Sequence, residues 1–208
     1  SFNSIGNMGA FWTATEYDAS NAKNRYLNNI NAQINSGRYN KTLGFSVRCL
    51  FDTKPPLVIG QDYQGGKVAY IFVSGNPGYV PGQVHGLIAA VADQSTGILW
   101  YNGSDTTTGA TATVLGTGFA NSNKIIASQA GTPVTYAAGL ARAYTGGGYT
   151  DWYLPSKDEL HKLYLNKEAI GGFLGNAYWS ASEQGASTVW YEAFASGMQG
   201  TGYKSSLI

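Results

Sequence analysis

The sequence predicts an α+β protein with two or three short helices, short antiparallel strands and long glycine-rich loops. Hydrophobic residues make up 43% of the 208 residues, which is enough to fill a core, and 28 glycines are available for loops. Short apolar runs of strand character occur together with three stretches of helical spacing. This mixture favours an α+β fold over a β-sandwich or a doubly wound parallel sheet.

The composition argues against several functional classes. Charged residues make up 12% of the chain, about half of the usual share, and the formal net charge is +1. The sequence therefore lacks the basic surface that nucleic acid or an anionic membrane attracts, and no apolar run approaches the roughly 20 residues of a membrane span. We expect no partner of either kind. Aromatic, amide and hydroxyl side chains take the place of charge, as they do on recognition surfaces.

The few metal-ligating side chains argue against an enzyme and against a cofactor. The chain has one cysteine, Cys49, so a multi-cysteine zinc site cannot form, and its two histidines, His85 and His161, nearly exclude a histidine-rich metal or acid–base cluster. Cys49 ends an apolar run and is predicted to be a small buried residue. We expect a structural role for His85 and a surface or half-buried position for His161.

The clearest local signal is a helix start at Ser156. Glu159 follows three residues later and completes a capping box, and acids in the first turn favour the helix dipole. We therefore expect Asp158 and Glu159 to be structural; general acid–base catalysis is the alternative. The other predicted elements are strands at 67–73, 86–91, 178–181 and 189–194, helices at 121–128 and 135–144, and loops at 74–82 and 102–118.

The chain also repeats itself. Residues 11–20, FWTATEYDAS, match residues 178–187, YWSASEQGAS, and residues 39–41 match 203–205 to within one position. The first copy continues into an alternating run at 44–50, whereas the second ends at Ile208. We therefore predict three parts: residues 1–52 as the C-terminal part of a first module, 53–58 as a proline linker, and 59–208 as a second module that lacks its last strand.

The unequal copies suggest how the second module is completed. We expect residues 45–51 to pair with the sheet of residues 59–208, either within one chain or from a neighbouring chain. The alternative is that further residues follow Ile208 and complete the module. Strand-mediated or other homo-oligomeric assembly is therefore possible.

The two copies share a scaffold and differ in the side chains on it. Trp12 and Trp179 recur at equal positions and are predicted as core residues. Asparagine, a poor strand former, is frequent between residues 21 and 41, which favours recognition; the alternative is a polar turn region. The predicted ligand-binding residues are Lys23, Asn24, Arg25, Tyr26, Asn28, Asn31, Asn35, Arg38, Tyr39, Trp190, Tyr191, Glu192, Gln199 and Tyr203.

The motifs FWTATEYDASNA and GFSVRC resemble the Fibrobacter succinogenes major paralogous domain. The motifs YQGGKVAYI, GYVPGQVHGLIAA, WYLPSKDEL and YWSASE resemble the C-terminal domain of the Legionella collagen-like adhesin. Both resemblances imply a C-type-lectin-like fold, and members of these families include variable proteins of diversity-generating retroelements. The formylglycine-generating enzymes have a similar fold but rely on cysteines that this chain lacks.

The resemblance implies a binding module rather than a calcium-dependent lectin. The Glu-Pro-Asn, Gln-Pro-Asp and Trp-Asn-Asp tripeptides that bind calcium and sugar in C-type lectins do not occur in the sequence. We expect a calcium-independent adhesion or receptor-recognition module that binds a protein or glycan receptor at the outside of a cell or on a virion. The alternative is a structural repeat of a surface filament, stalk or phage fibre that has no small ligand.

Overall fold

The computed structural model describes residues 8–30, 33–45, 47, 49, 56–129, 132–174 and 177–208. The chain divides into two compact units, Ser1–Pro55 and Pro56–Ile208, which are called the N-terminal and the C-terminal unit and are described separately. Helices and antiparallel strands occur together, which confirms the α+β class. The interpretation of the two units as C-type-lectin-like modules stays a prediction.

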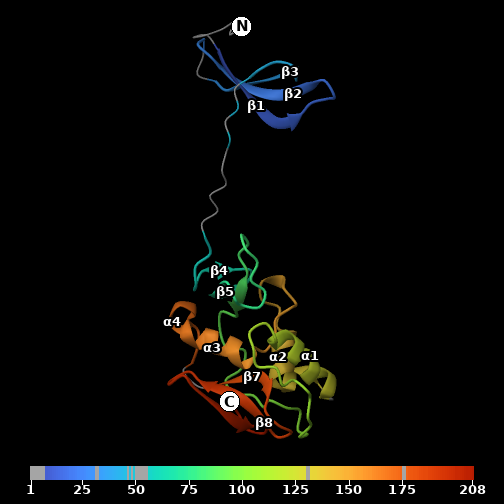
Figure 1. Cartoon of the computed structure of the whole chain (residues 1–208), viewed down its shortest axis with the longest axis vertical. Helices are drawn as coiled ribbons and strands as arrows, with labels where there is room; N and C mark the ends of the chain where they lie inside the picture. The colour runs from blue at the N-terminus through green and yellow to red at the C-terminus, as the bar shows by residue number, and fades with distance from the viewer. Residues whose placement is uncertain are drawn as a thin grey trace. The chain divides into compact units, whose positions relative to one another are not determined.

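The N-terminal unit is a three-stranded antiparallel sheet in the order β1-β2-β3 (Figure 1). Its strands are β1 (Met8–Glu16), β2 (Asn21–Asn28) and β3 (Asn35–Asn40). The asparagine-rich stretch therefore forms two paired strands, and the alternative of a polar turn region is wrong. Cross-strand pairing outweighs the low strand propensity of asparagine, because propensity in sheets depends strongly on context.

The C-terminal unit has two separate three-stranded antiparallel sheets. The first contains β4 (Asp62–Tyr63), β5 (Gly66–Ile71) and β6 (Gly86–Ala89); the second contains β7 (Ala177–Glu183), β8 (Thr188–Ala193) and β9 (Met198–Tyr203). The apolar runs at 67–73, 86–91, 178–181 and 189–194 coincide with β5, β6, β7 and β8, as predicted. The apolar character of these runs and the periodicity of their residues were sufficient to locate the strands.

Four α-helices complete the C-terminal unit, among the residues that the structure describes: α1 (Gly118–Ser128), α2 (Ala137–Ala143), α3 (Lys157–Leu165) and α4 (Lys167–Ile170). Single turns of 3₁₀ helix at Pro133–Thr135 and Gly146–Gly148 flank α2. The predicted capping box of α3 is present, with the Ser156 hydroxyl accepting from the Glu159 amide and the Glu159 carboxylate accepting from the Ser156 amide. Helix α3 lies between the two sheets and contacts β5 on one side and β7 and β8 on the other (Figure 1).

The main core of the C-terminal unit forms around Trp100, Tyr136, Ile125, Trp179 and Val189, all buried. The prediction that Trp179 is a core residue is confirmed. Its counterpart in the N-terminal unit, Trp12, is only half-buried, against the ring of Phe45 at a centroid distance of 4.6 Å.

The predicted burial of Cys49 is wrong, because this residue is exposed. An apolar run indicates that a segment is suited to burial, but it does not show that a partner covers that segment. Residues 46, 48, 50 and 51 lie outside the described residues, so the predicted pairing of residues 45–51 with the C-terminal unit stays a prediction.

The sheets β1-β2-β3 and β7-β8-β9 have the same register. In the first sheet the pairing of β1 with β2 is interrupted between Trp12 and Glu16, and in the second the pairing of β7 with β8 is interrupted between Trp179 and Glu183. These residues are the ones that the two sequence copies align. The extra residues that make the irregularity therefore occur at the same place in both sheets, as expected of a bulge that has a structural purpose.

A glutamate–lysine ion pair closes each of these sheets. Lys41 bonds the carboxylate of Glu16, and Lys204 bonds that of Glu183. Each lysine also donates to the backbone of the preceding turn, Lys41 to the Ala19 carbonyl and Lys204 to the equivalent carbonyl of residue 186. Lys41 and Lys204 are thus equivalent, one position away from the sequence alignment of residues 39–41 with 203–205.

The two ion pairs differ in burial. The side chains of Glu183 and Lys204 are both fully buried, whereas those of Glu16 and Lys41 are 66% and 38% exposed. The cover in the C-terminal unit is the loop before α1: Lys204 donates to the Thr106 carbonyl at 2.8 Å and lies 4.7 Å from the centre of the Trp100 ring.

We predict that Lys204→Ala destabilises the C-terminal unit by about 3–5 kcal/mol, because it leaves the carboxylate of Glu183 buried without its cation. The matched variant Lys41→Ala is expected to cost less than about 1 kcal/mol, since exposed ion pairs contribute little. Urea unfolding of both variants measures the difference. If both variants lose the same free energy of unfolding, burial does not determine how much this ion pair contributes to stability.

Candidate functional site

Helix α3 presents a row of polar and aromatic side chains along the second sheet. Lys157, His161 and Tyr164 follow one another at intervals of four and three residues, which places them on one face of a helix. The capping box at Ser156 fixes where this helix begins and therefore which residues face the sheet.

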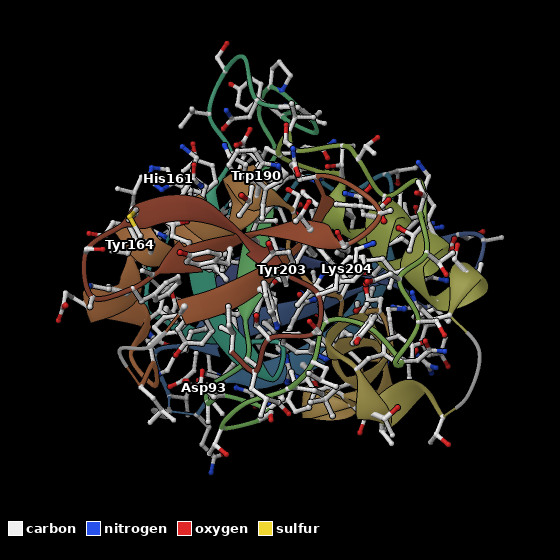
Figure 2. All side chains as sticks on the ribbon, turned by 90° about the horizontal axis from the view of Figure 1, so that it is seen from below. Asp93, His161, Tyr164, Trp190, Tyr203 and Lys204 are labelled. Atoms are coloured by element: carbon white, nitrogen blue, oxygen red, sulfur yellow. The ribbon has the colours of Figure 1, made fainter. Side chains whose placement is uncertain are left out.

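Strand β8 supplies the side chains that face this row on α3. Trp190 and Glu192 are two residues apart in β8 and point to the same face of the sheet, and Gln199 of β9 pairs directly with Glu192. Figure 2 labels His161, Tyr164 and Trp190 around this sheet. We call the group of Lys157, His161, Tyr164, Trp190 and Gln199 the α3–β8 surface.

The buried carboxylate of Glu192 joins the helix to the strands. Its Oε1 lies 2.8 Å from Nδ1 of His161, and its Oε2 accepts from Nε2 of Gln199 at 3.3 Å. Glu192 is fully buried although His161 is partly exposed. A buried carboxylate needs such partners, since an unpaired one would be costly. The carboxylate therefore fixes the positions of His161 and Gln199.

Cations and aromatic rings are paired over the rest of the surface. The ammonium of Lys157 lies 5.3 Å from the centre of the Trp190 ring, and Lys167 lies 4.8 Å from that of Tyr164. The rings of His161 and Tyr164 are stacked, with their centroids 6.0 Å apart. Trp190, Tyr164 and Lys157 are all half-buried. The surface therefore offers rigid aromatic area together with hydrogen-bond donors, which is chemistry for binding.

The acids at the start of α3 have structural partners. The carboxylate of Glu159 accepts from the backbone amides of Gly116, Gly118 and Ser156 and from the hydroxyl of Tyr153. Burial, with the nearby negative charge of Glu159, raises the pKa of Tyr153 well above its usual range. These contacts give Glu159 a structural role at the start of α3.

No metal centre is evident in the described part of the chain, where no three histidine, cysteine, aspartate or glutamate side chains gather. His85 is exposed; its imidazole bonds the side chain of Gln83, and its carbonyl accepts from the Phe72 amide.

The predicted site residues of the C-terminal unit divide between two faces. Trp190, Glu192, Gln199 and Tyr203 share one face of the second sheet by strand alternation, and Tyr191 points to the other, against the main core. Tyr203 is exposed, whereas the full burial of Glu192 contradicts its predicted place on an exposed face. The reason is that α3 covers this end of the sheet and Glu192 is its anchor.

The predicted residues of the N-terminal unit are also divided between two faces. Lys23, Arg25 and Arg38 share the face that corresponds to Trp190 and Glu192. The opposite face carries the remaining described candidates, Asn24, Tyr26, Asn28, Asn35 and Tyr39. Asn24 is buried, which contradicts its predicted exposure, because it lies in the central strand. Asn31 lies outside the described residues.

Sequence reasoning missed Lys157 and Tyr164 as members of the site and gave His161 no role in binding. The spacing of the three residues on a helix with a clear N-cap was a usable signal. What the sequence could not indicate was that this helix face meets the face of β8 that carries Trp190 and Glu192.

The family model described as the Lcl C-terminal domain matches residues 89–207, which includes α1 to α4 and the whole second sheet of the C-terminal unit. No curated protein matches the chain. In the described residues, no helix is both long enough and apolar enough to cross a membrane.

We predict that His161→Ala destabilises the C-terminal unit by about 1–3 kcal/mol, because the buried Glu192 carboxylate loses its closest hydrogen-bond partner. The chain offers a matched control in His85→Ala, which should change the free energy of unfolding by less than about 0.5 kcal/mol. Urea unfolding followed by tryptophan fluorescence measures both. If His161→Ala leaves the free energy of unfolding unchanged, Glu192 does not anchor α3.

Proposed function

The chain belongs to the Lcl C-terminal domain family, and on this basis we propose that it is a surface-displayed, adhesin-like module that binds its ligand at the α3–β8 surface. The ligand we propose is a protein or a glycan receptor at a cell surface. The setting is extracellular, on a cell or a virion.

The observation that carries the proposal is the arrangement around Trp190. A half-buried indole faces an ammonium and lies in one row with Tyr164, His161 and Gln199, while a buried carboxylate holds the helix in place. Tryptophan and tyrosine provide large contact area at a low cost in conformational entropy. Because the side chains are already positioned, binding would require little further ordering.

The proposed binding is independent of calcium and of any cofactor, and the module is not an enzyme. The donor groups available at the surface are an ammonium, an imidazole and an amide. Calcium takes about six to eight oxygen ligands, and of these groups only the amide supplies one, its carbonyl oxygen. The carboxylates closest to the surface, Glu192 and Asp158, are occupied by His161 and Lys157 respectively.

The proposal includes a C-type-lectin-like fold and a variable surface of the kind written by diversity-generating retroelements. The shared register and the shared ion pair of the sheets β1-β2-β3 and β7-β8-β9 support a common scaffold. The side chains on the corresponding face differ: Lys23 and Arg25 correspond to Trp190 and to the buried Glu192. Across related chains, variation should concentrate at 21–41 and 190–204.

The function is tested by binding of the purified chain to a glycan array and to a panel of displayed receptor ectodomains, in EDTA. We expect Trp190→Ala and Lys157→Ala each to weaken binding at least tenfold, which corresponds to about 1.4 kcal/mol. Tyr79→Ala, at an exposed aromatic residue of the 74–82 loop, is the control and should bind like the parent. Binding that needs calcium, or that neither surface variant weakens, would contradict the proposal.

A second candidate function is a structural repeat of a filament, stalk or phage fibre. The observation that favours it is the reuse of one sheet register and one ion pair in two successive units. Under this alternative no glycan or ectodomain is bound, and variation among related chains is even along the two sheets.

A further inference from the structure

We propose that the C-terminal unit pairs with a second copy of this chain through the outer edge of β9, so that the second sheets of two molecules join into one antiparallel sheet. The same strand contributes on both sides of the contact, and a two-fold axis passes through Thr201, so the interface is isologous. The pairing would bring two α3–β8 surfaces to the same side of the joined sheet.

The other edge strands of the C-terminal unit are short, irregular or covered. Strand β4 has two residues and begins at the charged Asp62, and the pairing of the short strand β6 with β5 is interrupted. The pairing of β7 with β8 is interrupted as well, and the β7 amides of Ala181 and Glu183 already donate to the carbonyls of Pro155 and Ala110. Natural proteins use such features to prevent pairing from edge to edge.

Strand β9 has none of these features in the part of the chain that the structure describes. It pairs with β8 without interruption over six residues, Met198–Tyr203, and contains no charged residue and no proline. Met198 and Tyr203 are 57% and 66% exposed, and Figure 2 labels Tyr203 at the end of the strand. A regular, uncharged and accessible edge is a template for a further strand.

The register of β9 determines which of its backbone groups are free. The amide of Lys204 donates to the Ser187 carbonyl at 2.9 Å, so by alternation the even-numbered residues of β9 direct their backbone groups toward β8. Gln199, Thr201 and Tyr203 therefore direct their amides and carbonyls away from β8, toward the outer edge.

The described residues that follow β9 turn toward the core. The Ser206 amide donates to the Tyr203 carbonyl in a turn, and the Lys204 carbonyl accepts from the amide of Trp100, a residue of the main core. Thr201, in the outer half of the strand, is exposed. The free amides and carbonyls of the edge are therefore accessible to another strand.

The symmetry of these free groups is the reason that the proposed partner is a second copy. Gln199 and Tyr203 lie two residues on either side of Thr201. In an antiparallel pairing centred on Thr201, this residue exchanges two hydrogen bonds with the partner's Thr201, and the Tyr203 amide donates to the partner's Gln199 carbonyl. No charged side chain of β9 is placed opposite another. One chain has a single β9, so this pairing requires a second molecule.

The equivalent edge of the N-terminal unit carries a charge. The equivalence of Lys41 with Lys204 makes β3 the counterpart of β9 and Arg38 the counterpart of Thr201. Self-pairing of β3 would place two guanidinium groups directly opposite each other, and such like-charge pairs are destabilising. Of two equivalent edges, the chain therefore protects one with a charge and leaves the other uncharged.

The pairing leaves room for α3. The side-chain amide of Gln199 donates to the Lys157 carbonyl at 3.3 Å, so α3 begins next to this residue. In the joined sheet Gln199 and the partner's Gln199 are displaced by four residues along the strands, which is about 14 Å at the usual rise per residue. Two helices with diameters of about 10 Å fit at that separation.

The joined sheet would make the module bivalent. A two-fold axis perpendicular to the sheet keeps Trp190 and the partner's Trp190 on one face, with the two β8 strands three strand spacings apart, or about 14 Å. Two sites that engage one surface together hold more firmly than either site alone. This consequence rests on the proposed function, whereas the pairing itself does not.

The first test is sedimentation equilibrium of the full chain over a range of concentrations. We expect a monomer–dimer equilibrium, and Thr201→Arg, which gives β9 the residue that β3 has, should weaken the association at least tenfold. Val73→Arg adds the same charge at an exposed residue outside the strand and should associate like the parent. A chain that is monomeric at all concentrations, or whose association Thr201→Arg leaves unchanged, would overturn the proposal.

The second test identifies the strand and its register by disulfide cross-linking in a Cys49→Ser background. Thr201→Cys places two thiols at the axis, with a Cα separation of about 5.5 Å that a disulfide can span, and oxidation should give a covalent dimer. Val73→Cys is the control and should stay monomeric. No cross-link at residue 201, or an equal yield from the control, contradicts the assigned pairing. Trp190→Ala should still associate, so loss of pairing and loss of ligand binding are distinguishable.

Discussion

The C-terminal unit depends on two buried carboxylates that hold a long segment without secondary structure. Between Trp100 and α1 the described chain has no helix or strand, so its backbone amides cannot be satisfied by a ladder. Glu183 accepts from the amides of Thr108 and Gly109, and Glu159 accepts from those of Gly116 and Gly118. A carboxylate that receives several amides is well solvated by the protein, and its charge-assisted bonds are stronger than neutral ones. The loop, the second sheet and the start of α3 are thereby fixed to one another.

The same logic extends to the α3–β8 surface. Glu192 is a third buried carboxylate, and its partners are side chains of the surface itself instead of loop amides. A ligand that touched His161 or Gln199 would meet groups whose orientation is already determined by an interaction beneath them. A buried carboxylate that bonds the surface side chains makes a binding surface rigid without making it apolar. This use of charge is consistent with a chain that has a small charged fraction but three buried glutamates.

Local sequence patterns predicted the helices and strands well, but they did not predict which distant segments contact one another. The capping box at Ser156 and the apolar strands at 67–73 and 189–194 depend on neighbours within a few residues, so the sequence contains all that is needed to find them. The bond between Glu183 and Lys204 could not be predicted, because the repeat aligns Glu183 with Glu16 but does not indicate that a lysine is buried beside it. The burial of Glu192 and the exposure of Cys49 could not be read from a pattern, because each depends on whether another segment covers the strand.

The two ion pairs have the same geometry but contribute differently to the stability of their sheets. In the C-terminal unit the loop covers Glu183 and Lys204, and burial makes the pair a strong constraint on the sheet. In the N-terminal unit the same geometry is exposed to solvent, where an ion pair contributes under about 1 kcal/mol. The register of β1-β2-β3 must therefore be held by its backbone ladder and by the aromatic contacts of Phe45 with Trp12 and Tyr39. Because one register is kept under such different cover, the sheet tolerates change at Lys23 and Arg25, whose side chains take no part in the ion pair or in these aromatic contacts.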